Sequence, residues 1–210
     1  MKYDWSKITT LAYQTLIELN ISEFPVSINK IRPAGVRVTS YQNYSKKTGL
    51  PIDLLTLNHE LDDAFFLQEL RPGLKLILYN KDKYGPRLKH SLWHEVGHIK
   101  CNHKKHSEKE EIEAHFFAAQ ANAPNAVIKE IAKRGYSIDI LFLQECFGLS
   151  EKSARKKKDY LNKYNFDHYN EYDDVIIKLF IDYINKNYPS KVDMDDNYYD
   201  DLEADRNNWY

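Results

Sequence analysis

Apolar residues recur every three or four positions in several separate stretches of the chain, and this spacing gives a helix one apolar face. Capping residues, prolines and glycines bound most of these stretches. The pattern predicts helices over residues 4–19, 86–101, 108–123, 126–134, 138–147, 150–161 and 174–187. A shorter helix is predicted over 27–31, and the mixed signal over 42–58 indicates a loop or a short helix near 52–57.

Alternating or β-branched residues predict strands over 36–41, 63–70 and 75–79, the last two separated by the turn signal Arg71-Pro72-Gly73. Together they predict an α+β fold in which a small antiparallel sheet packs on helices. An exposed sheet edge can bind an extended peptide as an added strand. Residues 75–80 are our candidate for that role, and an ordinary sheet strand without substrate contact is the alternative.

The length of 210 residues suits one domain or a domain with an extension. We expect a single domain over residues 1–165, whose closing part over 136–165 is helical and resembles a helix-turn-helix. Residues 166–210 then form a C-terminal extension with one amphipathic helix and an acidic, mobile tail. The basic cluster Arg155 to Lys158 suggests a DNA-reading helix, although a solvated helix face is the favoured interpretation.

The formal net charge is −1, so no strongly basic field attracts nucleic acid, and no direct contact with it is expected. The only two cysteines, Cys101 and Cys146, give no disulfide framework and fit a reducing compartment. The N-terminus lacks the apolar core of a signal peptide, and no apolar run approaches the roughly 20 residues of a membrane span. These features predict a soluble, cytoplasmic protein without a membrane partner.

The candidate chemistry lies in His94-Glu95-Val96-Gly97-His98, on the helix predicted over 86–101. Two histidines four residues apart share one helix face, so both imidazoles can reach one metal ion. The glutamate between them can hold a water molecule near that ion and take its proton. This is the H-E-x-x-H pattern of zinc hydrolases, and a surface helix that carries two histidines by chance is the alternative.

A catalytic zinc site needs a third protein ligand. His103 and His106 are available but follow the helix where the chain turns into solvent. The next helix offers four glutamates, Glu108, Glu110, Glu111 and Glu113. Two helices approach closely across small residues, and Glu111 shares its face with Ala114, His115, Ala118 and Ala121. Glu111 is therefore the favoured third ligand, and Glu113 is the second choice. His115, one turn after Glu111, could hydrogen-bond a metal ligand, and an ordinary core histidine is the alternative.

These residues resemble the ImmA/IrrE metallopeptidase family, which shows H-E-x-G-H, then E-x-E-A-N-x-F-A-A, then a proline. The match covers the HEVGH helix, the stretch from Glu111 to Ala119, and Pro124. The chain departs from the pattern at His115, where the family has Asn, and before Pro124, where apolar Leu-Leu-Met is usual. The resemblance implies a zincin-like fold of the gluzincin type, with Glu111 as the third zinc ligand.

The interpretation that unites these features is a zinc-dependent endopeptidase in which Glu95 acts as general base and acid. Tyr79, Tyr84 and His90 are candidate oxyanion donors. The resemblance implies a protein substrate, namely a helix-turn-helix repressor of a prophage or mobile element, cut at one site. The alternatives are a zinc-holding module that sequesters such a repressor without cleaving it, and a direct DNA-binding regulator.

Overall fold

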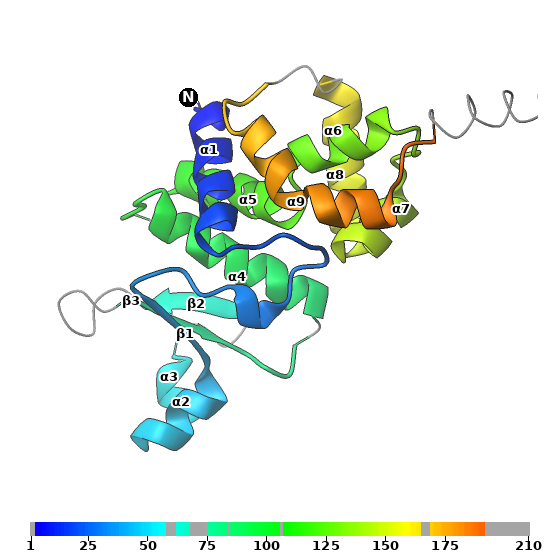
Figure 1. Ribbon diagram of the computed structural model, residues 1–210. Coiled ribbons are helices and arrows are strands. Elements are labelled where there is room, and N and C mark those ends of the chain that lie inside the picture. The colour runs from blue at the N-terminus through cyan, green and yellow to red at the C-terminus, as the bar shows by residue number, and fades with distance from the viewer. Residues whose placement is uncertain are drawn as a thin grey trace, which may run out of the picture.

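The computed structural model describes residues 3–57, 62–67, 75–83, 85–105, 107–164 and 169–191. Figure 1 shows a body of helices above a small sheet, with a pair of short helices on the other side of that sheet. The predicted turn at Arg71 to Gly73 and the acidic tail lie outside the described residues, as do Tyr84 and His106.

The sheet contains β1 (Val36–Ser40), β2 (Ala64–Leu67) and β3 (Lys75–Tyr79), in the order β1-β3-β2. β2 and β3 are antiparallel, as predicted, but β1 runs parallel to β3. The fold is the predicted α+β class, with a mixed rather than a wholly antiparallel sheet. An alternating pattern places side chains on faces but carries no information on strand direction, so the sequence could not reveal this difference.

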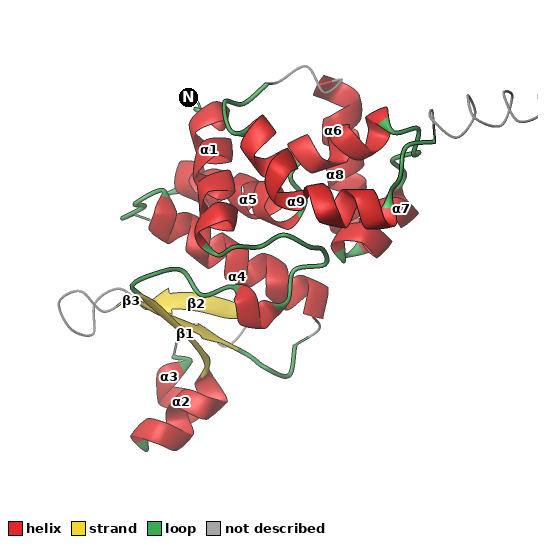
Figure 2. Ribbon diagram, viewed as in Figure 1, coloured by secondary structure: helices red, strands yellow, loops and turns green. Residues whose placement is uncertain are grey.

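Our expectation that residues 75–80 form a substrate-binding edge strand is wrong. β3 lies in the centre of the sheet and pairs with β1 on one side and β2 on the other (Figure 2). Its backbone hydrogen-bonding groups are therefore committed to the sheet, and an added strand has no free edge to join. β2, an edge strand among the described residues, contacts the helix that carries the HEVGH residues.

Side chains of the central strand alternate between two apolar clusters. Ile77 belongs to the main core, whereas Leu76 and Leu78 join a smaller cluster on the opposite face with Phe65. That smaller cluster is covered by α2 (Tyr41–Thr48) and α3 (Ile52–Leu55). The sheet is thus covered on both faces, by the helical body and by the α2–α3 pair.

Sequence patterning missed α2 because its residues Tyr-Gln-Asn-Tyr-Ser-Lys-Lys-Thr are polar and form no apolar stripe. Its ends are nevertheless well marked. The Ser40 hydroxyl accepts a hydrogen bond from the Asn43 backbone N–H over 3.1 Å, which caps the first turn. Gly49, with φ at 75°, ends the helix in the left-handed conformation that glycine adopts without strain.

The remaining helices begin and end within three residues of their predicted bounds. Asp4 caps the first helix by accepting from the Lys7 backbone, and the predicted capping box between Ser107 and Glu110 is present. These helices are α1 (Trp5–Glu18), α4 (Gly85–Lys100), α5 (Glu108–Asn122), α6 (Asn125–Lys133), α7 (Ile140–Phe147), α8 (Glu151–Tyr164) and α9 (Asp173–Asn187). A 3-10 turn, Ile28–Lys30, replaces the short helix predicted there.

A buried hydrogen bond joins the helix pair α7–α8 to α4. The Lys89 side chain is buried, and its ammonium donates to the carbonyl of Phe147 over 2.8 Å, at the C-terminus of α7. Gly148 then joins α7 to α8 in a left-handed conformation, with φ at 63°. A Cβ atom there would lie 2.9 Å from both Lys89 Nζ and Pro25 Cβ, so glycine is required.

Helix α9 contributes to the main core, although residues 166–210 were expected to form an extension. Ile176, Phe180 and Ile184 are fully buried, and the Phe180 ring stacks on Phe24 with centroids 4.5 Å apart. The domain boundary at residue 165 stays a prediction. Within the described ranges, no helix combines the length and the apolar character that a bilayer span requires.

Candidate metal centre

Helices α4 and α5 lie very close together at Gly97. A Cβ atom built on Gly97 would lie 3.1 Å from Phe117 Cδ1 and 3.2 Å from the Ala114 backbone. The small face of α5 that we predicted from the sequence is fully buried at Ala114, Ala118 and Ala121. The close approach places the N-terminal half of α5 directly over the two histidines of α4.

Three candidate ligands converge at this crossing. His94 Nε2 and His98 Nε2 lie 3.0 Å apart. The Glu111 carboxylate approaches both rings, with Oε2 3.2 Å from His94 Nε2 and Oε1 3.4 Å from His98 Nε2. Tetrahedral ligands at the usual zinc distances of about 2.0–2.1 Å are separated from one another by about 3.3 Å. Two imidazole nitrogens and one carboxylate at these spacings would suit a zinc ion.

The protonation of His94 suits such a ligand set. Burial lowers the pKa of His94 to about 3, and the neighbouring imidazoles of His115 and His98 act in the same direction. The ring is therefore neutral at physiological pH and has a nitrogen lone pair to offer a metal ion.

Glu95 is buried on the face of α4 that meets the sheet, with 9% of its surface exposed. Burial raises its pKa to about 8, while a hydrogen bond from the Phe66 backbone in β2 acts against this rise. The nearby Glu111 carboxylate raises the pKa further. A divalent cation close to Glu95 would favour the ionised form and so restore its capacity to accept a proton.

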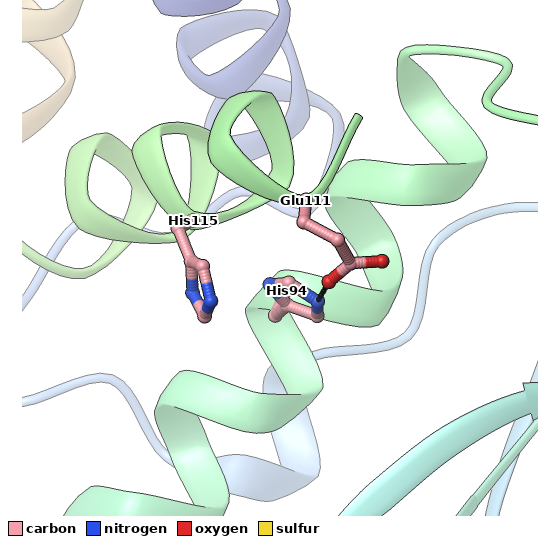
Figure 3. A group of neighbouring side chains, drawn as sticks. All are labelled: His94, Glu111 and His115. Atoms are coloured by element: carbon pink, nitrogen blue, oxygen red, sulfur yellow. Dashed lines mark ion pairs between the residues drawn. The ribbon is translucent and has the colours of Figure 1, made fainter. Parts of the chain in front are cut away.

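His115 lies one helical turn after Glu111 and faces His94, as Figure 3 shows. Ligand atoms of His94, Glu111 and His115 all lie within 4.8 Å of one another, so this trio is a second candidate set that shares two members with the first. The spacings of 3.0 to 3.4 Å among His94, His98 and Glu111 match zinc better. His115 instead contacts His90, whose Nε2 lies 3.3 Å from His115 Nδ1.

The predicted hydrogen bond from His115 to a ligand is not among the contacts of the described residues. His94 Nδ1 is buried there without a hydrogen-bond partner, although the His94 and His115 ring centroids are only 4.3 Å apart. Whether His115 supports the site stays a prediction.

His103, considered from the sequence as a third ligand, contacts His98 from the side opposite the three converging atoms. Its Nδ1 lies 3.0 Å from His98 Nδ1, and its Nε2 lies 3.2 Å from a carboxylate oxygen of Glu113. Sequence reasoning missed this arrangement, because it depends on how the chain turns after α4.

Of the three candidate oxyanion donors, the structure describes Tyr79 and His90. Tyr79 ends β3 and packs against the main core, and His90 lies one turn before His94 on α4. In the part of the chain that the structure describes, neither is distinguished as a donor by a hydrogen bond into the site.

Comparison with protein-family models gave a match over residues 48–158 to the peptidase family described as the IrrE N-terminal-like domain. The matched segment begins at the end of α2, includes β2, β3, α4 and α5, and continues into α8. No curated protein and no solved structure gave a match. Because the matched segment spans more than half of the chain and includes both helices of the candidate centre, the protein belongs to the ImmA/IrrE family of metallopeptidases.

Proposed function

We propose that this protein is a zinc-dependent endopeptidase whose metal ion is held by His94, His98 and Glu111. The observation that carries the proposal is the set of three spacings of 3.0, 3.2 and 3.4 Å among their ligand atoms. Membership of a metallopeptidase family supports the same reaction class. When bound, zinc supplies Lewis acidity, which polarises a peptide carbonyl and brings the pKa of water down to about 7.

Glu95 carries out the proton transfers of the reaction. Ionised Glu95 accepts a proton from the attacking water as the water oxygen bonds to the carbonyl carbon. Glu95 then delivers that proton to the amine nitrogen as the C–N bond breaks. Its burial reduces competition from solvent, and its hydrogen bond from the Phe66 backbone orients the carboxylate.

The strand that we propose to bind the substrate backbone is β2. Among the described residues it is a sheet edge, and it contacts α4. Asn80 N–H donates to the Asp63 carbonyl over 2.9 Å, so the antiparallel ladder to β3 uses the backbone groups of residues 63, 65 and 67. Those of Ala64 and Phe66 therefore point away from β3. Because the Phe66 N–H donates to Glu95, an added peptide would pair through the Ala64 groups and the Phe66 carbonyl. An extended peptide added there would run beside Glu95.

We propose a helix-turn-helix repressor of a mobile element as the substrate, on the family resemblance. The DNA-binding alternative is weakened by the basic cluster itself. Lys157 is buried and donates to Asn125 Oδ1 over 2.7 Å, and Arg155 pairs with Glu151 on its own helix. Two of the four cationic side chains are therefore engaged within the protein.

The test is incubation of the zinc-loaded protein with the repressor encoded beside its gene. The natural sequence should cut the repressor at one site, and Glu95→Gln should bind zinc and repressor but cut about 10²–10⁴-fold more slowly. The matched control is Glu108→Gln, an exposed glutamate in the first turn of α5, which should cut normally. Derepression in cells by Glu95→Gln at the natural level would favour the sequestering module instead.

A further inference from the structure

The chain reverses direction directly after α4 and brings His103 back against the helix. Asn102 adopts a left-handed conformation with φ at 56°. Its N–H donates to the Ile99 carbonyl over 3.2 Å, and the His103 N–H donates to the His98 carbonyl over 2.9 Å. These two hydrogen bonds, with a left-handed residue between helix and loop, form a Schellman motif. The backbone thus fixes His103 one short turn away from His98.

The side chains then form a buried row from α4 to α5. His98 and His103 face each other through their Nδ1 atoms, 3.0 Å apart, with the rings inclined at 76°. His103 Nε2 lies 3.2 Å from Glu113 Oε2, and the other Glu113 oxygen lies 3.6 Å from Lys109 Nζ. The side chains of His98, His103 and Glu113 are 3%, 6% and 15% exposed, so water competes little for these contacts.

The Glu113 carboxylate determines which ring nitrogens of His103 and His98 carry protons. A carboxylate accepts hydrogen bonds, so in the neutral His103 ring the proton lies on Nε2 and the lone pair on Nδ1. His98 Nδ1 must then carry its own proton and donate it to His103. The remaining nitrogen, His98 Nε2, then has a lone pair to offer a metal ion held together with His94 Nε2 and Glu111.

We propose that His103 and Glu113 are positioning residues that hold His98 in the tautomer and ring orientation required for metal binding. This inference rests on the proposed metal centre. Histidine ligands usually donate their second ring N–H directly to a carboxylate or carbonyl group. Here a second imidazole transmits the effect of Glu113 to His98. Glu113, the second-ranked ligand candidate, thus acts on the centre without binding the metal.

The test uses Glu113→Leu and His103→Leu, with Glu108→Leu as the control on the same helix. Zinc affinity is measured by competition with a chelator. The two test variants should bind zinc about 10- to 100-fold more weakly, and the control should match the natural sequence. Glu113→Gln keeps an oxygen that accepts from His103, and it should stay within about 3-fold of the natural affinity.

A second readout is independent of zinc. Proton–nitrogen NMR spectra of the histidine rings in the metal-free protein should show His98 with its proton on Nδ1. Glu113→Leu should give a mixture of the two tautomers. The proposal would be overturned if zinc affinity were unchanged in both leucine variants. It would also be overturned if folded Glu113→Leu protein showed the same His98 tautomer as the natural sequence. Absence of zinc binding by the natural sequence would instead refute the proposed function, and the NMR result would still test the hydrogen-bonded row.

Discussion

The backbones of Gly97 and Ala114 are so close that a methyl group on Gly97 would lie 3.2 Å from both the Cα atom and the carbonyl oxygen of Ala114. One residue of the HEVGH stretch therefore sets the separation of the two helices that carry the candidate ligands. The small face of α5 was visible in the sequence, and Gly97 supplies the small residue of α4 that meets it.

Gly97→Ala should move α5 away from α4 by a few tenths of an ångström, because the added methyl group meets backbone as well as the Phe117 ring. Alanine favours the helix by about 1 kcal/mol over glycine, which offsets part of the steric cost. We expect zinc affinity to fall about tenfold while the protein remains folded. Chelator competition and thermal unfolding check this, and equal affinity would show that the helix separation does not limit the site.

His94 differs from His98 in lacking a partner for its second ring nitrogen among the described residues. His115→Asn would place an amide oxygen on the adjacent turn of α5, where it can accept from His94 Nδ1–H. We expect about a tenfold gain in zinc affinity. His115→Leu, which offers no acceptor, is the matched control and should show no gain. A gain in both variants would indicate that removal of the histidine itself is responsible.

Several features of the fold followed from the sequence because they depend on local patterns. Apolar spacing predicted the long helices, and Ser107 with Glu110 predicted the start of α5. The direction of β1 and the central place of β3 depend on how the chain crosses the sheet, which periodicity does not record. The helix α2 was hidden because caps at Ser40 and Gly49, rather than an apolar stripe, define it.

The contacts of the candidate site likewise include some that local sequence patterns predict and some that they do not. His94 and His98 are related by helical spacing, and Glu111 follows from the small face of α5, so the converging trio could be predicted. The contact between His98 and His103 requires a left-handed Asn102, and asparagine adopts that conformation in only some of its positions. The Phe66 contact to Glu95 joins residues from different elements, and no local pattern connects them.

Lys157 should make stability depend on pH. Burial lowers its pKa from 10.5 to about 7 in the folded protein. Between these values the unfolded chain binds a proton that the folded chain does not, so the free energy of unfolding rises with pH across that range. Lys157→Met should abolish this pH dependence, which amounts to about 1 kcal/mol of unfolding free energy per pH unit. Urea denaturation between about pH 7 and about pH 9 measures it, and the exposed Lys152→Met on the same helix should retain the rise.

Helix α9 should be required for stability, since Phe180 is fully buried and stacked on Phe24. Phe180→Ala should lower the free energy of unfolding by about 3–5 kcal/mol, whereas Val175→Ala, at an exposed position of α9, should change it by less than about 0.5 kcal/mol. A chain that ends at residue 165 should be destabilised as well. Full stability of that shorter chain would establish residues 166–210 as a separable extension.

The central claim is that one zinc ion is held by His94, His98 and Glu111. Anomalous diffraction from zinc-loaded crystals, recorded on both sides of the zinc absorption edge, locates the ion directly. We predict a single site with the ion about 2.0–2.2 Å from His94 Nε2, His98 Nε2 and a Glu111 carboxylate oxygen. An ion bound instead by His90 and His115, or by His103 and Glu113, or no ion at the crossing of α4 and α5, would contradict the account.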